Sequence, residues 1–192
     1  MKVLASCDPI YYKEHSTAFI NSCLDVGMQP VIRLAYNSTK EFYACNRFLV
    51  AEEYLEPAGV LITDVDCYFN KALPDIEEDV GIFLREYEKF PGMKVAAGIL
   101  WLNNTEKARL FITRVREIIT SQPLVWYADQ LALYKAYNEY KNNTSFFIFD
   151  NTHMDWEFND DSYMWTGKGN RKFHNTTYLK KKRHYESINP TT

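Results

Sequence analysis

Asp64 and Asp66 end the apolar stretch that begins at Gly59, in the sequence GVLITDVDCYF. Side chains at positions i and i+2 of an extended segment point to the same side, so both carboxylates can face one site. Two like charges so close raise each other's pKa unless a cation neutralises them. Hard oxygen ligands favour Mg²⁺ or Mn²⁺, which keep open positions for water and substrate phosphates. The pair therefore predicts a metal site that bridges the protein to a diphosphate.

Strands and helices alternate on the way to this pair. Apolar runs predict three strands, KVLASC, PVIRLAY and GVLITDV, the last of them buried on both faces. Asp8-Pro9 predicts the start of a first helix, and a capping box from Ser38 to Glu41 predicts the start of a second. Because ligands of open α/β sheets bind outside the carboxyl ends of the strands, this order places both aspartates at a ligand site.

The second half of the chain continues the α/β pattern. Expected strands are VGIFLREYEKF, MKVAAGILWLNN, SFFIFD and the start of SYMWTGKGNRK, and a last short helix is expected in TTYLKKKRHY. Asn104 is expected to cap a helix that Pro123 ends, with the apolar stripe Ala108, Phe111, Val115, Ile118 and Ile119, and another helix follows in WYADQLALYKAYNEY. We predict one α/β domain over 1–192, with a mainly parallel central sheet flanked by helices.

Composition excludes several classes of protein. The chain has 192 residues, 46% hydrophobic, and no apolar run approaches the roughly 18 residues that a membrane span needs. Its N-terminus turns polar too soon for a signal peptide, so a cytoplasmic location is expected. The four cysteines form no C-x-x-C pair, which favours small buried apolar side chains over a zinc site or a disulfide framework.

Charge is unevenly distributed along the chain. The segment 163–185 holds seven Lys or Arg residues and no acid, whereas the rest carries 15 basic and 25 acidic residues. This basic C-terminal flap on an acidic body predicts an anion site. The acidic body argues against a nucleic-acid-binding protein.

Several motifs occur in an order that resembles the glycosyltransferases with the GT-A fold, with family 8 and its small relatives as the nearest. These motifs are ASCDPIYY, YACNRFLVAEEYL, LITDVDCYF, AAGILWLNN, WYADQLALYKAY and WTGKGNRK. The resemblance covers almost the whole chain. It implies a nucleotide-binding part in 1–66 and a donor-sugar and acceptor part in 67–192, whose acceptor half must be minimal in so short a chain.

The resemblance also implies roles for the residues at the nucleotide end. Asp66 would be the main ligand of Mn²⁺ or Mg²⁺, and Asp64 would contact the metal or the ribose. Asp8 would hold the base of a UDP-sugar by a hydrogen bond, and Tyr11 or Tyr12 would stack on it.

Further roles concern the diphosphate and the sugar. Arg47 would reach the nucleotide or pyrophosphate, and Gly98 would let the backbone approach the sugar closely. Asp129 and Gln130 would touch sugar hydroxyls or the acceptor. Basic residues of the flap would clamp the leaving diphosphate, namely Lys168, Arg171 and Lys172.

One departure from the family concerns the third metal ligand. Many relatives have a His just before the loop that ends in the conserved Lys, and here that place falls near Thr166. His174 is the first candidate to replace it, with His153, Asn151 and Asp150 as others.

The reaction expected from the resemblance is sugar transfer to an acceptor hydroxyl on a glycan, lipid or protein. An inverting enzyme could use Asp129 as general base, whereas in a retaining enzyme Gln130 would lie near the reactive face. Alternatives are a nucleotide-sugar-binding protein or slow UDP-sugar hydrolase, and a phosphatase of the haloacid dehalogenase type, whose D-x-D normally follows the first strand.

Overall fold

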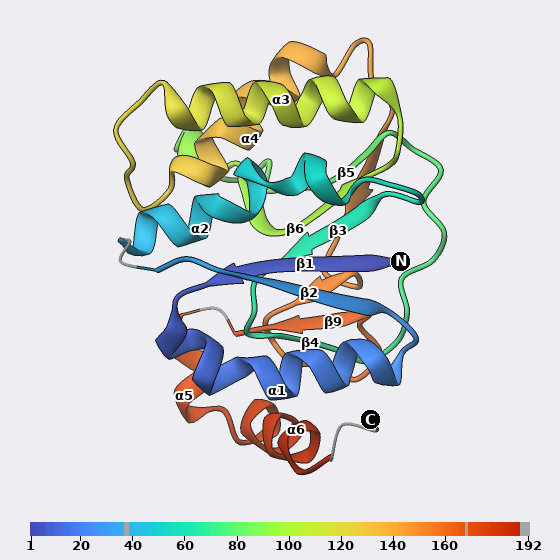
Figure 1. The fold of residues 1–192 in the computed structure, drawn as a ribbon, viewed down its shortest axis with the longest axis vertical. Helices are drawn as coiled ribbons and strands as arrows, with labels where there is room; N and C mark the ends of the chain where they lie inside the picture. The colour runs from blue at the N-terminus through green and yellow to red at the C-terminus, as the bar shows by residue number, and fades with distance from the viewer. Residues whose placement is uncertain (37–38, 168, 189–192) are drawn as a thin grey trace.

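The computed structural model describes residues 1–36, 39–167 and 169–188. Strands and helices alternate from the N-terminus, as the apolar periodicity predicts (Figure 1). The first half contains β1 Lys2–Cys7, α1 Pro9–Asp25, β2 Gln29–Leu34, α2 Lys40–Leu49, the 3₁₀ turn η1 Ala51–Tyr54, β3 Val60–Thr63 and β4 Cys67–Phe69. The second half contains β5 Val80–Leu84, the 3₁₀ turn η2 Pro91–Met93, β6 Val95–Leu102, α3 Glu106–Thr120, α4 Ala128–Tyr140, β7 Phe146–Phe149, β8 Met154–Asp155, β9 Met164–Thr166, α5 Arg171–His174 and α6 Thr176–Ser187.

The central sheet has the strand order β2-β1-β3-β6-β5-β7 among the described residues. The β1–β2, β1–β3 and β5–β7 pairs are parallel, whereas β6 runs antiparallel to both of its neighbours. All four residues of β3 are buried, as expected for a strand covered on both faces. Its carboxyl end delivers the chain directly to Asp64.

Helices cover both faces of this sheet (Figure 1). On one face, α2, α3 and α4 pack over a core in which Phe48, Phe111 and Leu133 are buried. On the other face lie α1 and a small sheet, β4-β9-β8, around a second core that includes Phe19, Phe69 and the cysteines Cys7, Cys23 and Cys67. The four cysteines of the sequence are buried and free, which confirms the interpretation of them as small apolar side chains.

The basic C-terminal segment returns to the start of the chain. Helix α6 packs against α1, and a third core joins them through Tyr68, Trp165, Tyr178 and Tyr185. This packing carries the end of the chain back to the residues that follow β1 and β3. None of the described helices combines the length and apolar character needed to cross a membrane.

Several local boundaries differ from the expected ones, most of all in VGIFLREYEKF, where β5 ends at Leu84. The N-cap of α2 is Thr39, whose hydroxyl accepts from the Phe42 amide, while the expected cap Ser38 lies outside the described residues. The N-cap of α3 is Thr105 rather than Asn104, because its hydroxyl reaches the Ala108 amide at 3.2 Å. The second strand ends at Leu34, before the end of the apolar run. Apolar pattern alone does not fix where an element ends.

Candidate active site

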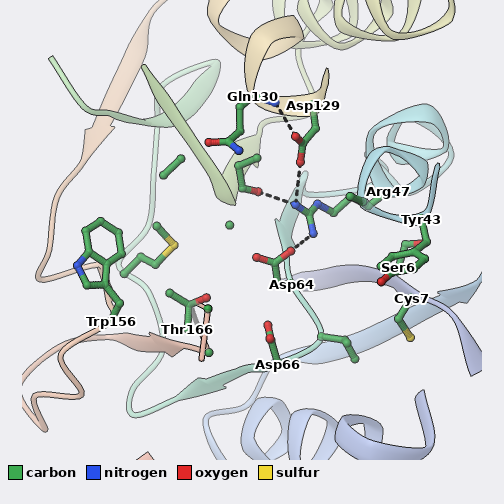
Figure 2. A pocket seen from close by; sticks show the side chains of 18 of the residues that line it. Ser6, Cys7, Tyr43, Arg47, Asp64, Asp66, Asp129, Gln130, Trp156 and Thr166 are labelled. Atoms are coloured by element: carbon green, nitrogen blue, oxygen red, sulfur yellow. Dashed lines mark hydrogen bonds and ion pairs between the residues drawn. The ribbon is translucent and has the colours of Figure 1, made fainter. Parts of the chain in front are cut away.

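A cavity of about 420 Å³ opens at the carboxyl ends of β1 and β3. Its walls come from segments far apart in the sequence: the ends of these two strands, the helices α2 and α4, strand β6 and the loop after β9 (Figure 2). Asp64 and Asp66 lie near its middle, with Arg47 and Asp129 on one side and Thr166 on the other. The D-x-D pair and residues from widely separated segments of the chain therefore line one cavity.

Arg47 links two carboxylates on the α2 side of the cavity. This side chain is 3% exposed; its Nη1 donates to the Asp64 carboxylate, and its Nη2 lies 3.5 Å from Asp129 Oδ2. Nη2 also donates to the Ala97 carbonyl at 3.0 Å. Burial lowers the pKa of Arg47, but the two carboxylates outweigh it and the pKa is raised overall. Arg47 is thus a charged side chain, held by several contacts, that orients both Asp64 and Asp129.

Asp129 is buried at the start of α4. Burial raises its pKa from 3.8 to about 6, although the nearby Arg47 opposes this shift. One of its oxygens accepts from the Gln130 amide at 2.8 Å, which fixes the carboxylate at the first turn of the helix. The carboxylate therefore faces the cavity in a set orientation and carries its charge at neutral pH.

Asp66 is held from the opposite side by the basic C-terminal segment. Lys172 Nζ donates to Asp66 Oδ2 at 2.6 Å and to the Tyr11 hydroxyl at 2.9 Å. Tyr178, fully buried, donates to the Asp66 carbonyl at 2.8 Å. Burial raises the pKa of Asp66, while Lys172 opposes that shift. The basic segment therefore reaches the D-x-D pair, with Lys172 as the residue in contact.

The donor chemistry around Asp64 and Asp66 fits a divalent cation. The ligand atoms of Asp64, Asp66 and Cys67 lie within 4.8 Å of one another, the one such group among the described residues. The sulfur of Cys67 is a soft ligand, which Mg²⁺ and Mn²⁺ do not favour. Two carboxylates remain, a hard oxygen set of the kind that Mg²⁺ and Mn²⁺ accept beside waters and phosphates.

Two glycines let the chain pass close to these carboxylates. A Cβ on Gly98 would lie 3.2 Å from Asp64 Oδ2, and one on Gly167 would lie 3.0 Å from Asp66 Oδ2. Contacts this short would push the carboxylates aside. Both positions therefore keep the space next to the pair open.

The far end of the cavity has a different lining. Arg85, Met93, Trp126, Gln130, Met154 and Trp156 contribute to it. Arg85, only 5% exposed, donates from Nη2 to the Val95 carbonyl at 2.7 Å and to the side-chain oxygen of Gln130. Trp126, in contrast, is 59% exposed at the mouth. This end combines aromatic surface with a buried positive charge.

Most of the site residues expected from the sequence meet in the cavity. Its lining includes Tyr11, Arg47, Asp64, Asp66, Gly98, Asp129, Gln130 and Lys172. Among the described residues, four others do not line it. Asp8 caps α1 by accepting from the Tyr11 amide at 2.7 Å, Tyr12 is partly exposed, and Arg171 pairs with Glu157. His174 is exposed on α5. Lys168 lies outside the described residues.

The resemblance places the histidine of the family near Thr166. This residue lines the cavity beside Asp66, whereas His174, His153, Asn151 and Asp150 are not among the lining residues (Figure 2). His153 instead bonds Asp150 and stacks on Tyr163. The structure thus brings no described histidine to the two carboxylates.

Sequence reasoning missed several residues of the lining, chiefly Tyr43, Arg85, Trp126, Trp156 and Gly167. Arg85 carried a usable signal, because it follows the apolar strand IFL as Asp64 follows LIT. The two tryptophans lie on loops, where no periodicity marks which way a side chain points.

No protein-family model matches the sequence, and no curated protein matches it. The structure, in contrast, resembles solved glycosyltransferases over nearly its whole length. One glycosyltransferase is involved in glycosylation of the major capsid of PBCV-1; it shows a TM-score of 0.63 and 14% identity, with 96% of this chain and 98% of that chain covered. GlyE of Streptococcus pneumoniae shows a TM-score of 0.67 and 12% identity, with 98% of this chain and 60% of GlyE covered.

The galactosyltransferase LgtC, solved with donor and acceptor sugar analogs, shows a TM-score of 0.63 and 11% identity, with 100% of this chain and 98% of LgtC covered. At such identities the matches establish the fold. The chain has the GT-A fold, an α/β architecture with a mostly parallel central sheet flanked by helices, as the sequence predicts.

Proposed function

We propose that the protein is a metal-dependent glycosyltransferase that moves a sugar from a UDP-sugar to an acceptor hydroxyl. The observation that carries this proposal is the meeting of Asp64 and Asp66 with Lys172 in one cavity of a GT-A fold. Two carboxylates suited to a divalent cation beside a lysine suited to phosphate make a diphosphate site.

The nucleotide would enter at the end of the cavity lined by Ser6, Tyr11 and Tyr43. An aromatic ring can stack on any nucleobase, because every base has a π-face. Asp8 caps α1 beside Tyr11, so a contact with the base would run through the oxygen not used for the cap. This end lies next to Lys172, so the diphosphate would lie in the middle of the cavity.

The diphosphate would be held between the two carboxylates and the basic segment. Asp64 and Asp66 would hold Mn²⁺ or Mg²⁺, which when bound would neutralise the charge that develops on the leaving diphosphate. Lys172 would exchange its bond to Asp66 for one to a phosphate oxygen, so its positive charge stays buried and paired throughout. Arg47 would keep Asp64 oriented during the same step.

The sugar would lie between the D-x-D pair and the first turn of α4. Asp129 and Gln130 border this space together with Gly98. With a pKa of about 6, Asp129 is ionised above neutral pH and could take the proton of the acceptor hydroxyl in an inverting reaction. In a retaining reaction, Gln130 would instead be the group nearest the reactive face.

A thermal-shift screen tests the proposal. UDP, GDP, CDP, UDP-glucose and UDP-galactose are each added with and without Mn²⁺. A ligand present at about 100 times its Kd adds about 2.7 kcal/mol. This corresponds to roughly 5–10 °C for a chain of this size. We expect such a rise with UDP and Mn²⁺ together, and a much smaller one with either alone.

Two variants sharpen the screen. Asp66→Asn should remove the Mn²⁺-dependent part of the shift, whereas Asp161→Asn, at an exposed position outside the cavity, should leave it unchanged. If no nucleoside diphosphate raises the melting temperature in the presence of metal, the proposal is wrong. Release of UDP that is no faster with any acceptor than with water would point to a hydrolase.

A further inference from the structure

Arg85 is a buried charge without a counter-ion. Its side chain is 5% exposed and lines the far end of the cavity, at the carboxyl end of β5. No carboxylate of the described residues lies within ion-pair distance of it, although Arg47 in the same cavity has two. Nη2 makes two hydrogen bonds, but Nε makes none and is completely shielded by the protein.

Such a group is costly unless something pairs with it. A guanidinium cannot lose its proton in a protein, so burial cannot be relieved by neutralisation. The effective penalty for a buried ion amounts to several kcal/mol. A carbonyl and a neutral amide oxygen satisfy two N–H bonds but supply no opposite charge. Burial lowers the pKa of Arg85, and the more distant Tyr87, Glu88 and Asp129 oppose this shift without cancelling it, whereas the pKa of Arg47 is raised overall by its two carboxylates.

The position of Arg85 identifies the part of the substrate that it faces. It bonds the side chain of Gln130, which borders the proposed sugar position, whereas Lys172 bonds Tyr11 at the proposed nucleotide end. The proposed diphosphate already has Lys172 and the metal pair. An anion at Arg85 must therefore belong to the sugar end of the substrate.

We propose that Arg85 binds the carboxylate of an acidic sugar, supplied either by the sugar of the donor or by the acceptor. This inference rests on the proposed function and names the substrate class that the site selects. Because Nη2 is already bonded and Nε is shielded, a carboxylate would meet the guanidinium at Nη1, through a charge-assisted hydrogen bond. A neutral sugar would leave the buried charge of Arg85 uncompensated. An unpaired buried group discriminates strongly against a substrate that lacks its partner, so the site should favour acidic over neutral sugars.

Calorimetric titration in the presence of Mn²⁺ separates the two sources of the carboxylate. In the donor arm, UDP, UDP-glucose and UDP-glucuronate are titrated into the protein. In the acceptor arm, glucuronate and glucose are titrated into the protein saturated with UDP and Mn²⁺. We expect the acidic member of one arm to bind at least about tenfold more tightly than its neutral partner.

Three variants show whether Arg85 is responsible. Arg85→Met should abolish the preference for the acidic ligand while leaving UDP affinity within about twofold. Arg85→Lys keeps the charge but loses the guanidinium N–H groups and their bonds to Val95 and Gln130, so it should retain part of the preference. Arg114→Met is the matched control, because Arg114 is exposed on α3 and paired with Glu117 and Glu139. If a variant folds poorly, the comparison of acidic and neutral ligands in the unchanged protein still tests whether the site prefers an acidic sugar.

The outcomes separate this inference from the proposed function. UDP binding without any acidic preference in either arm would overturn the role of Arg85 and leave the glycosyltransferase proposal in place. An acidic preference that survives in Arg85→Met would also overturn it, because the carboxylate would then bind elsewhere. Failure of UDP to bind would remove both proposals together.

Discussion

Arg47 and Arg85 are two buried arginines in one cavity, and they differ in what surrounds them. Arg47 lies between the carboxylates of Asp64 and Asp129, whereas Arg85 meets a carbonyl and an amide oxygen. The charge of Arg47 is paired by carboxylates of the protein itself. Arg85 has hydrogen-bond acceptors but no carboxylate within ion-pair distance among the described residues.

The difference separates a part of the cavity whose buried charges are paired within the protein from a part where a charge is left for the substrate to pair. Around the D-x-D pair every buried charge among the described residues has a partner, so the geometry is set before any ligand arrives. At the sugar end one charge is left for the substrate to pair. Pre-organisation and specificity thus lie in neighbouring parts of the same cavity.

The largest effect is expected from breaking the Arg47 pairs. Arg47→Met leaves the buried Asp129 without its ion-pair partner, and removing one member of a buried pair costs about 3–5 kcal/mol. The free energy of unfolding, measured with urea, gives the loss. Arg33→Met is the control, because Arg33 pairs with Glu53 at 3.8 Å on the surface, where such pairs contribute about 1 kcal/mol or less. Equal losses in the two variants would contradict the comparison.

A second break, on the other side of the pair, should cost somewhat less. Lys172→Met leaves Asp66 without its ammonium partner, but Tyr178 still holds the backbone of that residue. We expect a loss of about 2–4 kcal/mol at pH 8, by the same reasoning. The control Lys107→Met removes an exposed contact of 3.9 Å to Asp79. A Lys172→Met protein as stable as this control would show that the Asp66 pair adds nothing to the fold.

His15 shows how a buried group behaves when it can give up its charge. It is 2% exposed and bonds the Tyr68 hydroxyl at 3.1 Å; burial, with Lys182 and Lys172 adding to it, lowers its pKa from 6.5 to about 3. Glu14 lies 3.5 Å away, yet it does not keep the ring charged. Neutral His15 thus avoids the cost that Arg85 cannot avoid.

This pKa predicts the direction of a pH effect. Between pH 6.5 and 3 the unfolded chain binds a proton at His15 and the folded chain does not, so acidification favours unfolding. From pH 7 to pH 5 this group alone should lower the free energy of unfolding by about 2 kcal/mol. His15→Phe should lose that part of the slope, while His174→Phe at an exposed position should keep it. Identical slopes for all three proteins would contradict a neutral His15.

The smallest effect on stability is expected at Arg85. Because Arg85 forms no ion pair with any residue that the structure describes, Arg85→Met removes a desolvation penalty together with two hydrogen bonds. We expect a change in the free energy of unfolding within about 1 kcal/mol in either direction. A loss as large as that of Arg47→Met would show that Arg85 stabilises the fold, and the contrast between the two arginines would disappear.

Much of the fold could be predicted from the sequence, because its signals are local. The buried run VLIT, the cap at Asp8-Pro9 and the α3 stripe each follow from residue type and spacing, and the structure bears them out. The position of Asp64 and Asp66 at a strand end follows in the same way. The order of the motifs then indicates the GT-A fold, which the structural matches confirm.

The packing of segments far apart in the chain could not be predicted from the sequence. It could show that the C-terminal segment is basic, but not that Lys172 reaches Asp66 while Arg171 turns to Glu157, since both depend on how α5 and α6 dock on α1. The isolation of Arg85 likewise appears only when every neighbouring carboxylate has been located.

The most direct test of the account is a titration of UDP into the protein with and without Mn²⁺, followed by the same titration into Asp66→Asn. We expect Mn²⁺ to tighten UDP binding by about tenfold or more in the unchanged protein, about 1.4 kcal/mol, and to have no such effect in the variant. UDP binding that is equally tight with and without Mn²⁺, or equally tight in Asp66→Asn, would contradict the claim that the D-x-D pair holds a metal on a diphosphate.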